Sequence, residues 1–398
     1  MTERKTKIAY LVRPAEGGIK SHVLTLMNGL DKSRFEPVLI CPPDSSLYEE
    51  AEKAGHRVIP LDLVGEISPV KDMLTSLRLR WILLRLRPDV LHIHSTKAGF
   101  VGRLAVIAKR GRPRVILTVH SFVFDERVKR LKRMITAWIE RRLLRYTDRI
   151  LAVSNALKDE LVSQMRLRPA KIQVIYNGVV FRDVPKPEHT GIRVGTVARL
   201  APQKGVEHFI RAAALVKKKY RSAKFIIVGD GPFRYWLETM AQQYGVRDCI
   251  EFTGFRPDPL SIAAGFDVFV MTSMRETFGM ALVEAMSLGV PVVASNVGGI
   301  PEIVDGSTTG LLAEPGNAED IAKKICMLLK DKDLAAQIGR AGCESVRAKF
   351  TVDRMLDEIQ HVYETPMTTE APRTQRRPLR KLRLGRIRLR RNRNPGGE

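Results

Sequence analysis

The 398-residue sequence contains no apolar run that approaches the ~20 residues a membrane-spanning helix needs. Its charged N-terminus does not resemble a secretory signal peptide, because the apolar stretch that follows ends by Val12. Only four cysteines are present, and they lie far apart without the spacing of a disulfide framework or a zinc site: Cys41, Cys249, Cys326 and Cys343. We therefore expect buried thiols in a reducing cytosol rather than disulfides.

Two common ligand-binding patterns are also missing. The dinucleotide fingerprint G-x-G-x-x-G is absent, and its nearest match, Gly229-Asp230-Gly231, has Arg234 where the third glycine would stand. The one Asp-x-Asp, Asp331-Lys332-Asp333, falls in a polar turn between two predicted helices rather than at the end of a strand. We therefore expect neither an essential metal nor another cofactor.

Positive charge is unevenly distributed along the chain. The net charge is +16 over residues 1–182, +2 over residues 183–350, −3 over residues 351–365 and +9 over residues 366–398. The last segment mixes arginine with leucine and isoleucine and has no aromatic residue to stack on bases, which favours an anionic lipid surface over nucleic acid. We expect this tail to be disordered in isolation.

Short β-branched apolar segments alternate with amphipathic helical stretches in two successive series. Strands of this kind, buried on both faces of a parallel sheet, predict an α/β protein built from right-handed βαβ units. The first predicted series of strands is 8–12, 38–41, 90–94, 115–119, 150–153 and 174–176, and the second is 193–198, 225–228, 250–253, 268–271 and 291–294.

A short polar segment with two prolines, residues 182–189, separates the two series. It predicts an N-terminal domain over residues 1–182 and a C-terminal domain over residues 183–350. Residues 351–365 are predicted to form a final helix that packs back on the N-terminal domain, and the basic tail of residues 366–398 follows it.

Two loops carry groups suited to phosphate. Gly17 and Gly18 follow the first predicted strand and open a helix, where a ligand can approach free backbone N–H groups, although a plain glycine turn has the same pattern. Arg199 and Lys204 share one strand-to-helix turn of the second series. An arginine fork and a lysine point charge suit a diphosphate, and the alternative is a pair of solvated surface cations.

The strongest pattern is the segment 275–285, which leads from a predicted strand into a helix. It contains Glu276 and Glu284, which would share one face if both were helical. Two carboxylates near a cleft can act as acid and base in glycoside hydrolysis, or can accept hydrogen bonds from sugar and ribose hydroxyls. The surrounding glycines and helix starts attract anions and favour the second role over a capping and a surface glutamate.

His92 and His94 alternate along one predicted strand and therefore face the same side of its sheet. Because no third metal ligand is evident, acceptor or structural contacts are favoured over a metal site. Ser95 and Lys97 follow at the end of this strand and are, with His94, candidate contacts for an acceptor.

Taken in this order, the motifs resemble glycosyltransferase family four, whose members are retaining enzymes of the GT-B architecture. The resemblance covers residues 7 to about 363. It is carried by Gly17-Gly18, Thr118-Val119-His120, Ser154-Asn155, Asn177-Gly178, Arg199 with Lys204-Gly205, Gly229-Asp230-Gly231-Pro232 and the segment from Glu276 to Glu284. It implies an α/β fold of two facing Rossmann-like domains with parallel sheets and a cleft between them.

The resemblance also implies roles for individual residues. Glu284 would bind the ribose hydroxyls, and Arg199 and Lys204 would hold the diphosphate. Glu276 would bind hydroxyls of the donor sugar, and His120 would lie over its anomeric centre. The further donor contacts that it implies are Gly17 and Gly18, the backbone near Phe278, Gly279 and Met280, and Arg256 beside the base.

The implied activity is that of a hexosyltransferase-type, metal-independent enzyme. It would move a sugar from a nucleotide-diphosphate sugar, with UDP favoured, to a hydroxyl of a glycan or lipid-linked acceptor in cell-surface polysaccharide or glycolipid synthesis. Two alternatives remain: a sugar-nucleotide 2-epimerase of the same architecture, and a non-catalytic membrane-surface binding protein with a transferase fold.

Two stretches of the first domain, residues 70–87 and 126–149, have the pattern of basic amphipathic helices. Either one face of each lies in the core and the other is solvated, or the two helices dock on anionic lipid together with the basic tail. The second interpretation predicts a cytoplasmic protein that is peripheral on the inner face of the cell membrane.

Overall fold

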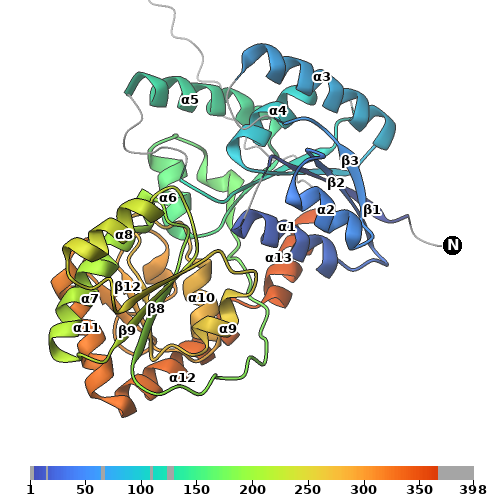
Figure 1. Ribbon diagram of the computed structural model, residues 1–398. Coiled ribbons are helices and arrows are strands. Elements are labelled where there is room, and N and C mark those ends of the chain that lie inside the picture. Colours follow the sequence, from blue (N-terminus) through green and yellow to red (C-terminus); the bar gives the residue numbers. More distant parts are fainter. Residues whose placement is uncertain (1–3, 15–16, 64–67, 108–110, 123–129, 366–398) are drawn as a thin grey trace, which may run out of the picture. The chain divides into compact units, whose positions relative to one another are not determined.

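The apolar segments of the N-terminal half form one parallel sheet, with helices on both of its faces (Figure 1). The computed structural model describes residues 4–14, 17–63, 68–107, 111–122 and 130–365. The seven strands lie in the order β3-β2-β1-β4-β5-β6-β7. Their bounds are β1 (Thr6–Val12), β2 (Phe35–Cys41), β3 (Arg57–Pro60), β4 (Val90–His94), β5 (Arg114–Val119), β6 (Arg149–Ala152) and β7 (Ile172–Val174).

The C-terminal half repeats this architecture with a second parallel sheet. Its six strands lie in the order β10-β9-β8-β11-β12-β13. Their bounds are β8 (Arg193–Val197), β9 (Lys224–Val228), β10 (Ile250–Gly254), β11 (Val268–Met271), β12 (Val292–Ser295) and β13 (Leu311–Ala313). The predicted α/β fold with two parallel sheets is therefore confirmed.

Helices connect the strands in both halves (Figure 1). In the first half they are α1 (Gly18–Gly29), α2 (Ser46–Lys53), α3 (Pro69–Leu86), α4 (Thr96–Ala105), α5 (Arg130–Leu143) and α6 (Asn155–Ser163). In the second they are α7 (Val206–Lys219), α8 (Arg234–Gln243), α9 (Pro259–Ala263), α10 (Met280–Ser287), α11 (Ala318–Lys330), α12 (Lys332–Lys349) and α13 (Val352–Glu364).

The structure departs from the predicted elements mainly at sheet edges. Strands β3 and β13 were not predicted, because both are edge strands whose apolar runs are only two or three residues long. The segment predicted as strand 174–176 pairs two residues earlier, as β7. Helix α5 covers only part of the predicted stretch 126–149, of which residues 126–129 lie outside the described residues, as does the tail from residue 366.

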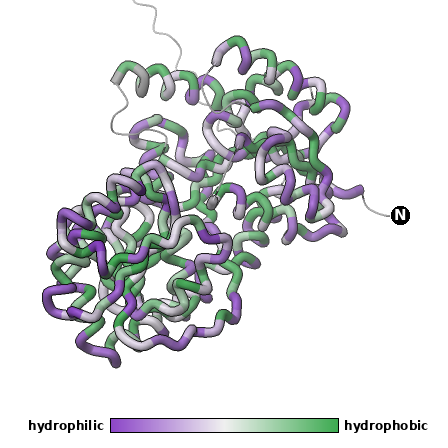
Figure 2. The backbone as a smooth tube through the Cα atoms, in the orientation of Figure 1, coloured by the Kyte–Doolittle hydropathy of each residue, from purple (hydrophilic) through white to green (hydrophobic). Residues whose placement is uncertain are grey.

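The central strands are buried on both faces, which explains their nearly unbroken apolar sequence. In β1, Ala9 and Leu11 enter one hydrophobic cluster, whereas Ile8, Tyr10 and Val12 enter another, and all five are 0% exposed. Hydrophobic segments accordingly gather inside both halves of the chain (Figure 2). Polar groups that meet a ligand can therefore stand only where such strands end.

Helix α13 packs on the N-terminal sheet although it comes last in the chain. It begins beside Gly178, where a Cβ would lie 2.5 Å from the Val352 Cα, so the chain can cross there only at a glycine. At its other end the Tyr363 hydroxyl lies 2.6 Å from His92 Nδ1 and 3.0 Å from the Tyr10 hydroxyl, all in the interior. Helix α13 thus belongs structurally to the first sheet.

The stability of the fold should fall steeply on mild acidification. Burial holds the pKa values of His92 and His94 well below the usual value for histidine. The unfolded chain takes up these protons at about pH 6.5, whereas the folded chain does not. The free energy of unfolding is therefore highest above that pH and falls as the pH decreases. Between about pH 7.5 and pH 5.5, each such histidine should lower the free energy of unfolding by roughly 1.4 kcal/mol.

Urea denaturation of His92→Gln at both pH values tests this expectation. The drop in the free energy of unfolding between them should shrink by roughly 1.4 kcal/mol relative to wild type, whatever the variant's absolute stability. An equal drop in wild type and His92→Gln would show that this imidazole accepts a proton in the folded state.

Candidate active site

A half-buried ion pair joins two loops at the carboxyl ends of strands β8 and β11. Lys204 Nζ lies 2.5 Å from Glu276 Oε2, and the Ser273 hydroxyl lies 3.3 Å from the same oxygen. The Lys204 and Glu276 side chains are only 27% and 12% exposed. The sequence assigned these two groups to different parts of a donor, and the structure places them in direct contact.

Backbone contacts fix the loop that carries Lys204 against the loop that carries Glu276. Gly205 has a φ of 58°, and a Cβ at this position would lie 2.2 Å from the Thr272 carbonyl oxygen. The Met274 N–H donates to the Gln203 carbonyl at 2.9 Å. Because a side chain at Gly205 would separate the loops, this glycine is a condition for the ion pair.

Glu276 and Glu284 do not share a helix face, contrary to one possibility drawn from their spacing. Helix α10 begins at Met280, so Glu276 lies in the preceding loop and only Glu284 is helical. Burial raises the pKa of Glu284, and the nearby Arg182 partly opposes this shift. A buried carboxylate with a raised pKa is stabilised in its charged form by hydroxyl groups that donate hydrogen bonds to it, such as those of a ribose.

The start of α10 offers backbone rather than side-chain contacts. Gly279 has a φ of 109°, and the first turn of the helix contains no acidic residue. The predicted contact Phe278 is only 2% exposed, and its ring packs against Tyr176 and Phe350. The Phe278 side chain is therefore a core residue, and what this segment presents to a ligand is its N–H groups together with the neighbouring Met280.

Thr277 connects this region with the first sheet. Its hydroxyl donates to the His120 carbonyl oxygen at 2.8 Å. The chain also comes close beside it, since a Cβ on Gly298 would lie 1.9 Å from the Glu276 carbonyl oxygen. Lys204, Glu276 and His120 are thus joined by one short series of contacts.

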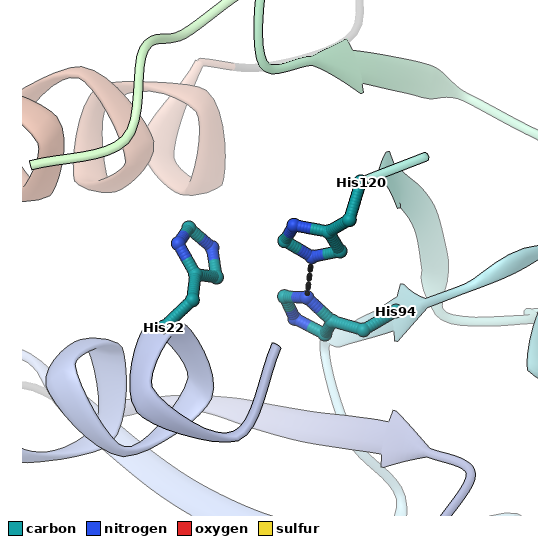
Figure 3. Close-up of side chains that lie close together, drawn as sticks. All are labelled: His22, His94 and His120. Carbon is teal, nitrogen blue, oxygen red and sulfur yellow. Dashed lines mark hydrogen bonds between the residues drawn. The ribbon is translucent and has the colours of Figure 1, made fainter. Parts of the chain in front are cut away.

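His120 belongs to a group of three imidazoles at the ends of β4, β5 and the start of α1 (Figure 3). His94 Nδ1 lies 3.0 Å from His120 Nε2, and the ring of His22 lies edge-on to that of His120 with centroids 4.8 Å apart. The Nε2 atoms of His22 and His94 are buried without a hydrogen-bond partner. Burial lowers the pKa of His22 to about 4 and that of His120 well below the usual value, so the group is neutral at pH 7.

The sequence analysis considered His92 and His94 together, whereas the structure groups His94 with His22 and His120. Both nitrogens of His92 are engaged, one with Tyr363 and one with the Thr118 hydroxyl at 2.7 Å. Among the described residues, His22, His94 and His120 could instead hold a metal ion, since one ligand atom of each lies within 4.8 Å of the others. Imidazole nitrogens suit Zn²⁺, but two of them already bond to each other.

A pocket of about 170 Å³ lies in front of His120. Its walls include Arg13, Ser95, Lys97 and Ser121, together with Ile19 in the first turn of α1. Of the predicted acceptor contacts, Ser95 and Lys97 therefore reach a cavity, whereas His94 is 0% exposed and does not.

Ser95, which lines the pocket, has a strained backbone conformation. Ser95 has a φ of 86°, a left-handed conformation that non-glycine residues rarely adopt and that recurs at binding sites. Gly17 and Gly18 at the start of α1 do not line this pocket, but a Cβ added at either would meet no atom within 4 Å, so both positions border open space. Both predicted glycines therefore leave room for an anion.

Two predicted donor residues stand apart from this group. Arg199 is exposed at the carboxyl end of β8, and no ion pair to it is found within the described part of the chain. Arg256 lines a different cavity of about 300 Å³, beside Glu251 and Phe266, to which none of the other predicted site residues contributes.

Sequence reasoning missed Arg13, His22 and Glu302. Arg13 follows β1 directly, at the sheet edge where ligands of parallel sheets bind, and this position was the available signal. Glu302 follows the Gly298-Gly299 segment and accepts hydrogen bonds from the N–H groups of Asn155 and Ala156, at 2.9 and 2.8 Å. It therefore caps helix α6 from the second half of the chain, a contact that no local pattern encodes.

Two families of glycosyltransferases match this chain in adjacent segments. Residues 16–181 match Glycosyltransferase Family 4, and residues 181–345 match Glycosyl transferases group 1. Among curated proteins, the chain is 27% identical over 380 residues to UDP-Gal:alpha-D-GlcNAc-diphosphoundecaprenol alpha-1,3-galactosyltransferase of Escherichia coli, covering 91% of this chain and 97% of that one. It is 26% identical to the capsular polysaccharide biosynthesis glycosyltransferase CapM of Staphylococcus aureus, covering 87% and 95%.

Solved structures agree on the fold. A crystal structure of HepE from Anabaena, in complex with UDP and glucose, superposes with a TM-score of 0.79 at 21% identity, covering 91% of this chain and all of that one. Sucrose-phosphate synthase from Thermosynechococcus elongatus gives a TM-score of 0.75 at 21% identity, covering 90% and 98%. The two Rossmann-like parallel sheets of the present chain are those of GT-B glycosyltransferases. The chain belongs to glycosyltransferase family four and is a hexosyltransferase.

Proposed function

We propose that this glycosyltransferase moves a hexose, with retention of anomeric configuration and without a metal, from a UDP-sugar to a hydroxyl of a lipid-linked glycan. The observation that carries the proposal is the series of contacts from Lys204 through Glu276 and Thr277 to His120. It brings a cation, a carboxylate and a neutral imidazole together at the ends of two sheets. The relative in Escherichia coli uses UDP-Gal and an undecaprenol-linked acceptor by its name, which supports the donor and the acceptor class.

The diphosphate would lie against Lys204 and the exposed Arg199. When the bond between the anomeric carbon and the diphosphate breaks, negative charge grows on the leaving oxygens. Glu276 already holds Lys204 in place, so this cation would stabilise the leaving charge with little rearrangement. Arg199 is exposed and would turn toward the diphosphate. The open N–H groups at Gly18 would add an uncharged anion contact.

Sugar and ribose hydroxyls would bind the two glutamates. Lys204 and Ser273 both contact Oε2 of Glu276, and Oε1 would accept a hydrogen bond from a sugar hydroxyl. Glu284 would accept both ribose hydroxyls, which compensates the burial that raises its pKa. His120, neutral and at the wall of the pocket, would orient the sugar beside the anomeric carbon.

The acceptor hydroxyl would attack from the same face that the diphosphate leaves. A new bond forms between the acceptor oxygen and the anomeric carbon, and the acceptor proton passes to an oxygen of the departing phosphate. The motifs place no nucleophilic side chain among the described residues that contact His120. This favours same-face attack by the acceptor over a covalent glycosyl-enzyme intermediate. Ser95 and Lys97, together with Arg13, would hold the acceptor in the pocket.

The cellular setting that we propose is the inner face of the cell membrane. The net charge of +16 over residues 1–182 and of +9 over residues 366–398 suits a surface of anionic lipid, where a lipid-linked acceptor would be presented. The described residues contain no helix long and apolar enough to cross a bilayer. Association would therefore be peripheral, through the N-terminal domain and the basic tail.

Donor binding is expected to raise the melting temperature in the presence of EDTA. UDP at about 100 times its Kd should add roughly 2.7 kcal/mol to the stability of the folded state. Glu284→Ala should lose most of this effect, because the ribose loses its acceptor. Glu344→Ala, an exposed glutamate on α12, is the matched control and should keep it. An equal shift in wild type and Glu284→Ala would remove this residue from the nucleotide site.

Loss of the loop cation should impair turnover more than folding. Lys204→Met is expected to lower kcat/KM for the donor by about 10²- to 10³-fold, since a preorganised charge on the leaving group is removed. Lys218→Met, an exposed cation on α7, should be neutral. The melting temperature of Lys204→Met must be measured beside the rate, because the variant leaves Glu276 unpaired. A fall in rate no larger than that of Lys218→Met would contradict the role of Lys204.

Metal removal should leave the reaction intact. Because Lys204, Arg199 and helix N-termini supply the positive field, kcat in excess EDTA should match kcat in untreated buffer within about twofold. Activity that disappears in EDTA and returns with Mn²⁺ or Zn²⁺ would point instead to the three imidazoles of His22, His94 and His120. Turnover of the nucleotide sugar without any acceptor, to its 2-epimer, would support the epimerase alternative.

A further inference from the structure

Helix α3 is apolar on two opposite sides. Its buried side is formed by Leu79, Leu83 and Leu86 with two buried polar residues. The other side carries a second apolar stripe, repeating at intervals of three and four residues and therefore continuous on a helix. It consists of Val70, Met73, Leu74, Leu77, Trp81 and Leu84, which are 40–72% exposed.

Helix α5 carries a second exposed apolar surface. Its exposed side carries Leu131, Met134, Ile135 and Trp138, at 51–68% exposure, again at intervals of three and four residues. Helix α4 contacts both α3 and α5, so the three helices lie side by side on one face of the first sheet (Figure 1). We call the exposed apolar residues of α3 and α5 the apolar ridge. Exposed apolar residues gathered along a helix in this way mark an interaction site in a folded protein.

Cations border the apolar ridge. Lys71, Arg78 and Arg85 are exposed on α3, about a quarter turn from the stripe. On α5 the Arg142 guanidinium lies 5.1 Å from the centre of the Trp138 ring, and Arg141 is exposed beside it. The side chains of Arg130, Lys132 and Arg133 lie outside the described residues.

The acidic groups of the same helices point inward. Asp72 is 4% exposed and binds Lys97 Nζ at 2.6 Å, and Glu140 is 6% exposed and binds Arg103 through two bonds of 2.7 Å. Within the described part of α3 and α5, the outer surface is therefore apolar and cationic, and the exposed Asp62 before α3 lies 3.7 Å from the Arg78 guanidinium. This pattern suits anionic lipid, whereas a second copy of the chain would bring cations against cations.

We propose that the apolar ridge is the surface by which this protein inserts into the head-group region of an anionic bilayer. The inference rests on the proposed function and specifies its membrane contact. Tryptophan, leucine and isoleucine would enter the boundary between head groups and acyl chains, and the flanking cations would meet lipid phosphates.

The ridge would also bring the acceptor pocket to the lipid surface. Asp72, on the inner side of α3, holds Lys97, and Lys97 lines the pocket beside His120. The pocket therefore lies on the inner side of α3, across that helix from its part of the ridge. A lipid-linked acceptor could enter it while its hydrocarbon stays in the membrane.

Tryptophan fluorescence of the full chain tests the proposal directly. The chain has three tryptophans, and two of them, Trp81 and Trp138, belong to the ridge, whereas Trp236 is on α8. In Trp236→Phe, vesicles of phosphatidylcholine with about 25% phosphatidylglycerol should shift the emission to the blue, and brominated lipids should quench it. The double variant Trp81→Phe/Trp138→Phe, which keeps only Trp236, should show neither effect. The basic tail contains no aromatic residue, so its own binding cannot mimic the signal.

Sedimentation with the same vesicles at ~0.15 M salt measures the strength of the contact. Leu77→Glu/Trp81→Glu should weaken partitioning at least tenfold. The matched control, Tyr235→Glu/Trp236→Glu, changes two exposed aromatic residues on α8 and should not. Both variants should keep the wild-type melting temperature and the turnover of a water-soluble acceptor, which separates this proposal from the proposed activity.

Three outcomes would overturn the proposal. The first is an unchanged emission of Trp236→Phe on anionic vesicles. The second is an equal loss of partitioning in the ridge variant and its α8 control. The third is a blue shift that grows with protein concentration without lipid and accompanies a doubled mass in size-exclusion chromatography, since the ridge would then be covered by a second copy of the chain.

Discussion

The double burial of the parallel strands is the constraint from which the site follows. Alternate side chains of β1 enter two different hydrophobic clusters, so a polar group within a strand, such as the Tyr10 hydroxyl, must find its partner inside the fold. Chemistry is confined to the residues at the carboxyl ends. There the first sheet contributes Arg13 and His120, and the second contributes Lys204 and Glu276, each within a few residues of a strand. Since every strand of a sheet runs the same way, these groups gather at one edge without a motif that links them in sequence.

Close backbone approach then turns this gathering into a defined geometry. An ion pair as sheltered as that of Lys204 and Glu276 is costly to desolvate and gains little unless its partners are held in place. The holding is done by main chain: Gly205 touches the Thr272 carbonyl, and Gly298 touches the Glu276 carbonyl, at distances where no Cβ fits. In the proposed reaction such rigidity would favour catalysis rather than stability, because a charge fixed before the reaction does not have to be reorganised during it.

The sequence predicted what is encoded locally and missed what depends on packing. Apolar runs and turn glycines were enough for the two sheets and for placing Gly17, Lys204 and Glu276 at strand ends, although the edge strands β3 and β13 had too little apolar signal. The spacing of Glu276 and Glu284 does not show that α10 begins only at Met280. The local sequence likewise does not show that the Phe278 ring is part of the hydrophobic core. His22 joined His94 and His120 only through the fold, across segments distant in the sequence.

The same packing leaves the outer face of α3 and α5 without acidic side chains of its own. Asp72 and Glu140 are drawn inside by Lys97 and Arg103, and these pairs neutralise the interior between α3, α4 and α5. The remaining cations are left outside, around apolar side chains that the core has no room for. Residues 183–350 carry a net charge of only +2, so the field of the molecule is polarised toward one half. A polarised surface orients a protein on a charged membrane before any apolar side chain inserts. The half that meets the lipid-linked substrate would then be the half that reaches the bilayer, which leaves the donor side open to nucleotide sugars in solution.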